Sequence, residues 1–139
     1  MSQQENVHAT KRFGEAINQG KLDTLRQVMA PGVVDHDPAP DQAAGPEGFV
    51  QFFEDFRDAF PDLEVSVEHM VCDDENVAIA YTVTGTQQGD FLGVPATGRQ
   101  ISARGMQIAR FADGKIVERW GSSDQLGILK QLGANPAAG

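Results

Sequence analysis

Residues 105–133 read GMQIARFADGKIVERWGSSDQLGILKQLG, and this stretch decides the fold. Its apolar and β-branched residues predict a strand over 101–111 and another over 116–123, joined by a tight turn at Asp113-Gly114. A short helix is expected over 125–132, with Gly133 ending it. Trp120 and Asp124 stand four residues apart at the end of the second strand, where a carboxylate beside an aromatic wall can carry a proton.

The turn also predicts which side chains share a face of this hairpin. With a two-residue loop, Ala112 pairs with Lys115, and further along Gln107 pairs with Trp120. Paired residues point to the same side of a sheet. The predicted pocket wall therefore carries Gln107, Trp120, Ser122 and Asp124, with space above the small residues Ala103 and Gly105.

Helices are expected before the strands. Apolar residues at helical spacing predict helices over 5–19 and 46–60. A shorter helix between them carries Leu22, Leu25 and Met29 and ends at Pro31-Gly32. A short strand follows over 33–36, and alternation predicts two more over 63–71 and 77–86. Helices followed by consecutive antiparallel strands are typical of an α+β fold. We expect residues 1–139 to form one α+β domain, in which the helices pack on one face of a curved antiparallel sheet and enclose a cone-shaped pocket.

The composition limits the partners and the compartment. A net charge of -9 argues against nucleic acid and anionic membranes, which favour basic surfaces. Cys72 is the single cysteine, so no intramolecular disulfide can form and a reducing compartment fits. The polar start of the chain lacks a signal-peptide pattern, and no run has the length of a membrane span. We expect a cytoplasmic protein.

Two candidate proton carriers each have a structural alternative. Asp124 is either a general acid/base or the cap of the following helix. Ser122 and Gln125 could form a capping box by themselves, which would leave Asp124 free. His36 is either a second proton carrier or a strand-end histidine bonded to a nearby aspartate.

Other candidates would line the pocket. His69 has the apolar parity of its strand, so it is either a core histidine or a site residue. Tyr81 could donate a hydrogen bond if it faces the cavity, and Phe91 belongs to a loop over 89–99 that is either a lid or plain surface. The sequence has no cysteine or histidine pair at metal-binding spacing, no glycine-rich phosphate loop and no Gly-x-Ser-x-Gly motif, so metal, phosphate-loop and serine-nucleophile chemistry lack support.

Several pieces of the sequence match a known family in order and spacing. They are Asp35-His36 before a proline loop, the segment 45–61, the loop GDFLGVPATGR at 89–99, Asp113 to Glu118 followed by Trp120 and Asp124, and Gln131-Leu132-Gly133. Together they resemble the SnoaL-like polyketide cyclases, or ester cyclases, of the NTF2-like superfamily. The resemblance implies the α+β cone, no metal or cofactor, and Asp124 as the acid/base of an intramolecular aldol cyclisation. Gln107 and Gln87 stand where relatives often have histidine.

Three functions follow as hypotheses. The first is a cofactor-free cyclase of a hydrophobic small molecule, in which Asp124 moves the proton, Trp120 stacks on the substrate, and His36 and Gln107 bind its carbonyl oxygens. The second is epoxide hydrolysis or ketosteroid-type isomerisation, and the third is a non-catalytic binding module. A homodimer or higher homo-oligomer is expected through the face that carries Arg104, Met106, Ile108 and Val117.

Overall fold

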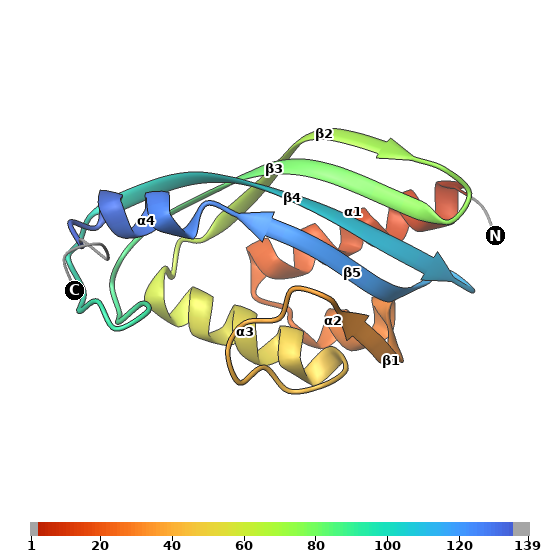
Figure 1. The fold of residues 1–139 in the computed structure, drawn as a ribbon, viewed down its shortest axis with the longest axis horizontal. Coiled ribbons are helices and arrows are strands. Elements are labelled where there is room, and N and C mark those ends of the chain that lie inside the picture. The colour runs from red at the N-terminus through yellow and green to blue at the C-terminus, as the bar shows by residue number, and fades with distance from the viewer. Residues whose placement is uncertain (1–2, 135–139) are drawn as a thin grey trace.

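A computed structural model describes residues 3–134. Its elements, in chain order, are α1 (Gln3–Gln19), α2 (Asp23–Val28), β1 (Met29–Asp35), α3 (Pro46–Ala59), β2 (Glu64–Cys72), β3 (Asn76–Thr86), β4 (Gln100–Ala112), β5 (Lys115–Ser123) and α4 (Gln125–Gln131). Helices α1, α2 and α3 lie on one side of a curved sheet, and α4 continues from the end of β5 (Figure 1).

The five strands form an open sheet in the order β1-β5-β4-β3-β2. Strands β2 to β5 pair antiparallel, whereas β1 runs parallel to β5. The helices cover the sheet's concave side (Figure 1). This arrangement confirms the predicted α+β cone.

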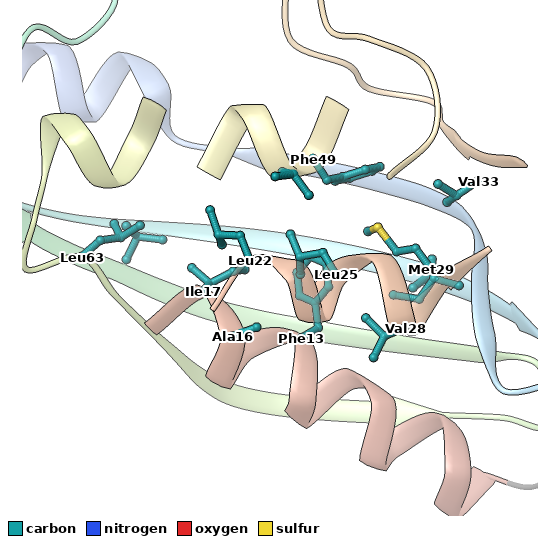
Figure 2. Close-up of a cluster of buried hydrophobic side chains, with 14 of the residues drawn as sticks. Phe13, Ala16, Ile17, Leu22, Leu25, Val28, Met29, Val33, Phe49 and Leu63 are labelled. Atoms are coloured by element: carbon teal, nitrogen blue, oxygen red, sulfur yellow. The ribbon is translucent and has the colours of Figure 1, made fainter. Parts of the chain in front are cut away.

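The core lies between the helices and the inner face of the sheet. Figure 2 shows Phe13 of α1, Leu25 of α2 and Phe49 of α3 in one cluster of buried side chains. Leu25 has no exposed surface, and Phe13 and Phe49 are 7% and 5% exposed. Burying one such side chain contributes about 1.5–3 kcal/mol, so the cluster fixes the three helices under the sheet.

One element boundary differs from the prediction. Helix α2 ends at Val28, and the expected helical residue Met29 instead begins β1. The Pro31-Gly32 pair lies inside β1, where the register with β5 is irregular between Met29 and Val34. Proline lacks an N–H for the ladder, but β1 is an edge strand and tolerates it.

The predicted hairpin register holds only near the turn. Ala112 pairs with Lys115 and Phe111 with Ile116, as predicted. A β-bulge at Val117 then shifts the pairing, so that Arg110 faces Glu118 and Gln107 faces Gly121 rather than Trp120. A one-residue shift exchanges the two faces of a strand. The predicted wall of Gln107 with Trp120 is therefore wrong beyond the bulge.

A second bulge changes the parity of β2. Val67 pairs with Tyr81 but His69 pairs with Ala80, which leaves Glu68 as the extra residue. His69 consequently lies on the outer face and is exposed. The prediction of His69 as a core or pocket residue is wrong for this reason.

Candidate functional site

Two adjoining chambers lie between the inner face of the sheet and the helices. The outer chamber has a volume of about 350 Å³ and is bounded by the loop after β1, by α3 and by the end of β5. The inner chamber has a volume of about 100 Å³ and extends under β3 and β4 toward α1. Both chambers share six lining residues, which are Phe13, Phe52, Phe53, Gln107, Arg119 and Ser123.

Arg119 is the cation at this junction. Its Nε donates to Gln107 Oε1 at 3.0 Å, and its Nη1 lies 3.2 Å from Asp35 Oδ1. The side chains of Arg119 and Asp35 are only 18% and 6% exposed. Within residues 3–134, Nη2 of Arg119 makes no hydrogen bond. One guanidinium nitrogen is therefore left to donate to a ligand oxygen.

Asp35 is held by three hydrogen bonds. Its Oδ1 accepts from the Asp37 backbone N–H at 2.9 Å as well as from Arg119, and its Oδ2 accepts from Gln42 Nε2 at 3.1 Å. These bonds fix the carboxylate at the end of β1. Because its oxygens are already engaged, Asp35 is suited to hold the Arg119 guanidinium in place.

Asp37 is the other carboxylate of the outer chamber. Its Oδ2 accepts from the Gly121 backbone N–H at 2.8 Å, which ties the loop to β5. Its Oδ1 has no hydrogen-bond partner in the described part of the chain. Asp37 is exposed, so this oxygen can accept a proton from a bound molecule.

Tyr81 brings a hydroxyl into the inner chamber. It makes no hydrogen bond to any atom of residues 3–134. Burial raises the pKa of the hydroxyl, and the nearby Arg119 charge lowers it in part. Tyr81 therefore stays protonated at neutral pH and can donate to a ligand oxygen. The sequence-based condition that Tyr81 faces the cavity is met.

Two glycines make room for these polar side chains. A Cβ at Gly105 would collide with the ring and hydroxyl of Tyr81, so Tyr81 fills the space that the sequence assigned to a ligand. A Cβ at Gly121 would collide with the Arg119 guanidinium. Glycine at both positions lets Tyr81 lie over Gly105 of β4 and lets the Arg119 guanidinium lie over Gly121 of β5.

Trp120 and His36 lie on the opposite face of the sheet. Trp120 pairs with Ile108 and is 37% exposed, and its ring stacks on His36 with the centroids 4.7 Å apart. His36 Nε2 lies 3.1 Å from Glu118 Oε1. Neither residue lines the two chambers. The bulge at Val117 explains this correction, because it turns Arg119 inward in place of Trp120.

Asp124 caps helix α4. Its Oδ1 accepts from the Gly127 backbone N–H at 2.8 Å, and its side chain is exposed outside both chambers. Of the two alternatives for Asp124, the helix cap is therefore the one that the structure shows, and the capping box at Ser122 that would have left Asp124 free does not replace it. Ser122 lies on the rim of the outer chamber.

The loop between β3 and β4 packs against the end of α3. Phe91 packs on Phe56 and Phe60 with ring centroids 5.4 Å and 5.3 Å away, and it lines neither chamber. The fully buried Gln87 donates to the carbonyls of Gly89 and Val94. Gln87 therefore holds the loop together, and Phe91 anchors it to α3.

Sequence reasoning placed Gln107 correctly in the cavity and missed Arg119, Asp35 and Asp37 as site residues. Gln107 is 9% exposed and lies on β4, whose alternation is uninterrupted. Regular pairing from the Asp113-Gly114 turn would put Arg119 on the outer face, but the bulge at Val117 turns it inward. The pairing of Asp35 with Arg119 joins residues of β1 and β5, and no local signal in the sequence indicates it.

Two further findings concern metals and membranes. In the described residues 3–134, no group of three or more His, Cys, Asp or Glu side chains could hold a metal ion. None of the helices in this part of the chain is both long and apolar enough to cross a membrane.

Comparison with known proteins gives consistent matches. The model of the SnoaL-like polyketide cyclase family matches residues 7–132. The aklanonic acid methyl ester cyclase DauD of Streptomyces sp. (strain C5) is 31% identical, covering 91% of this chain and 81% of DauD. Among solved structures, TsrD from Streptomyces laurentii superposes with a TM-score of 0.90 at 27% identity, covering 97% of this chain and 99% of TsrD. IdmH from Streptomyces antibioticus gives 0.81 at 33% identity, with 93% and 99% covered.

Proposed function

Because the chain belongs to the SnoaL-like polyketide cyclase family, we propose that it cyclises a neutral, largely apolar carbonyl compound by an intramolecular aldol reaction. The similarity to DauD, an aklanonic acid methyl ester cyclase, supports this class of substrate. The observation that carries the proposal is Arg119 Nη2, which has no hydrogen-bond partner within residues 3–134 and lies at the junction of an apolar chamber with a more polar one.

Each residue of the site has a separate role in the first step, which forms the enolate. Asp37 Oδ1 takes the proton from the carbon next to an ester or ketone carbonyl, and the electron pair moves onto that carbonyl oxygen. Arg119 Nη2 and the Tyr81 hydroxyl donate hydrogen bonds to the oxygens on which negative charge develops. Asp35 and Gln107 keep the guanidinium in place.

The reaction then closes without any co-reactant. The enolate carbon attacks a second carbonyl carbon of the same molecule, which forms one C–C bond and turns the attacked carbonyl into an alkoxide. The alkoxide takes back the proton held by Asp37. Substrate and product are isomers, so no oxidant, reductant or water is consumed. This mechanism keeps an aspartate as the proton carrier but assigns the role to Asp37 instead of Asp124.

Exchange of the acidic protons of methyl benzoylacetate in D₂O tests the first step. We expect the protein to accelerate this exchange, followed by ¹H NMR, over buffer alone. Asp37→Asn and Arg119→Gln should each lower the protein-catalysed rate about 100-fold, because removing one donor to a developing oxyanion costs about that much. Asp124→Asn is the matched aspartate control and should keep the wild-type rate. Equal losses in Asp37→Asn and Asp124→Asn would contradict the assignment.

We also propose that the chain forms a homodimer through the outer face of the sheet. This face exposes Met106, Ile108 and Trp120 at 67%, 46% and 37%, and Val71 of β2 at 54%. Exposed apolar patches of this kind mark interaction surfaces. Light scattering should give twice the mass of one chain, and Met106→Glu should give the monomer. A monomeric wild-type protein at high concentration would overturn the proposal.

A further inference from the structure

The inner chamber differs in chemistry from the outer one. Its walls are the aromatic and aliphatic side chains of α1, α3, α4 and the strands β2 to β4. Thr10 is a polar exception deep in the wall, but its hydroxyl donates to the Asn6 carbonyl at 2.9 Å. The other polar groups, apart from Tyr81, are Gln107, Arg119 and Ser123, and these line the junction with the outer chamber.

We infer that the inner chamber is a subsite for one small apolar group of the ligand, of about the size of a benzene ring. This inference rests on the proposed function, because it takes the ligand's carbonyl oxygen to lie against Arg119 at the junction. A ligand held there must direct one substituent inward and the rest of its body into the outer chamber. The apolar walls offer no partner to a polar or charged substituent, which would lose its hydration without compensation.

The size limit follows from the volume and from one small residue. An engineered apolar cavity of about 150 Å³ binds benzene, so a chamber of about 100 Å³ that adjoins the outer chamber has room for at most one ring or a short alkyl chain and excludes a fused ring system. Ala103 on β4 is 5% exposed and pairs with Val83 across the sheet. Its short side chain leaves this part of the chamber open, so Ala103 and Val83 set the size of the accepted group.

Binding of plain aromatic hydrocarbons tests the subsite without requiring any reaction. Benzene, toluene and naphthalene are titrated into the protein, and the methyl resonances of Ile17, Ile79, Val83 and Ile128 are followed by ¹³C-edited NMR. We expect benzene and toluene to shift these methyls, and naphthalene to bind at least 10-fold more weakly. Absent shifts with benzene, or equal affinity for naphthalene, would overturn the inference.

Two substitutions at the wall make the test specific. Ala103→Leu fills the chamber and should weaken benzene binding at least 10-fold, whereas Ala112→Leu, on the exposed end of the same strand, should leave it unchanged. Val83→Ala enlarges the chamber and should strengthen naphthalene binding, which keeps the inference testable if Ala103→Leu does not fold. Unchanged benzene binding in a folded Ala103→Leu variant, or unchanged naphthalene binding in Val83→Ala, would contradict it.

The same probes separate this inference from the proposed function. Arg119→Gln should lower the protein-catalysed exchange of methyl benzoylacetate about 100-fold yet change the benzene affinity less than twofold. Benzene binding in a protein that catalyses no exchange would leave the apolar subsite in place and reject the reaction. Catalysed exchange in a protein that binds no benzene would reject the subsite alone.

Discussion

The pairing of β3 with β4 is regular along its whole length, whereas the pairing of β4 with β5 in the same sheet is interrupted by a β-bulge. From Asn76 to Thr86, every residue of β3 faces its partner on β4 without a break. Along β5, the pairing with β4 shifts at Val117, two residues after the start of the strand. One inserted residue therefore exchanges the sides on which Arg119 and Trp120 lie.

This difference decides the chemistry of the cavity. A regular β5 would place the neutral, bulky Trp120 against Gln107 on the inner face. The bulged strand instead brings in a cation that Asp35 and Gln107 hold at the junction of the two chambers. Bulges re-aim side chains next to functional sites, and the bulge at Val117 does so for Arg119.

The largest effect is expected when the inward cation is removed. In Arg119→Met, the nearly buried Asp35 carboxylate loses its counter-charge, and breaking such a pair costs about 3 kcal/mol of the free energy of unfolding. Urea denaturation should show this loss. The double variant Asp35→Asn with Arg119→Met should recover part of it, since no charge is then left unpaired. A loss of stability below about 1 kcal/mol in the single variant would contradict a buried ion pair between Arg119 and Asp35.

A smaller effect on stability is expected from a substitution where β3 and β4 pair regularly. Gly105→Ala places a Cβ against the Tyr81 ring and should destabilise the protein by about 2 kcal/mol through overpacking. Gly14→Ala in α1 is the matched control, because nothing lies within 4 Å of the added Cβ. It should stabilise the protein by about 0.5–1 kcal/mol through helix propensity. Thermal unfolding of both variants checks the two signs, and equal signs would contradict the packing described for Tyr81.

A third prediction concerns Asp124, which follows β5 and caps helix α4. Asp124→Ala should cost about 1 kcal/mol, which is typical for loss of a helix cap, and should leave the exchange of methyl benzoylacetate unchanged. Chemical denaturation and the NMR exchange assay measure the two properties on one sample. A large loss of exchange with little loss of stability would restore Asp124 as the proton carrier.

The smallest effect concerns the charges on the outer face. Hydrogen bonds from Arg110 and then from His36 hold the pKa of the Glu118 carboxyl below its usual value of 4.5. Such a group stabilises the folded state above its unfolded pKa, and this contribution disappears as the pH falls through the lower folded value. Glu118→Gln should therefore be less stable than wild type at pH 6, and the difference should shrink as the pH falls below 4.5. A difference that grows toward low pH would contradict this reading of Glu118.

The sequence predicted most of the fold because the patterns behind it are local. Helical spacing places α1 and α3, alternation places the strands, and Asp113-Gly114 fixes the turn and the first two pairs of the hairpin. The position of Gln107 follows from the same alternation, since β4 has no interruption.

The part of the site that the sequence did not predict depends on two bulges and on contacts between distant residues. Neither bulge position, Val117 or Glu68, is a glycine or has another sequence feature that would indicate a bulge. Each bulge exchanges the two faces of the sheet for the residues that follow it in the strand. His69 and Trp120 therefore lie on the outer face of the sheet, although regular alternation predicts them on the inner face. Asp35 meets Arg119 only because β1 lies beside β5, which is a property of the assembled sheet.

The exchange rate of methyl benzoylacetate in Arg119→Gln and in Trp120→Phe tests the account most directly. These two variants change neighbouring residues that the bulge directs to opposite faces of the sheet. We predict that Arg119→Gln loses about 100-fold of the protein-catalysed rate and that Trp120→Phe keeps it within about twofold. Loss of the rate in Trp120→Phe with retention in Arg119→Gln would contradict the account.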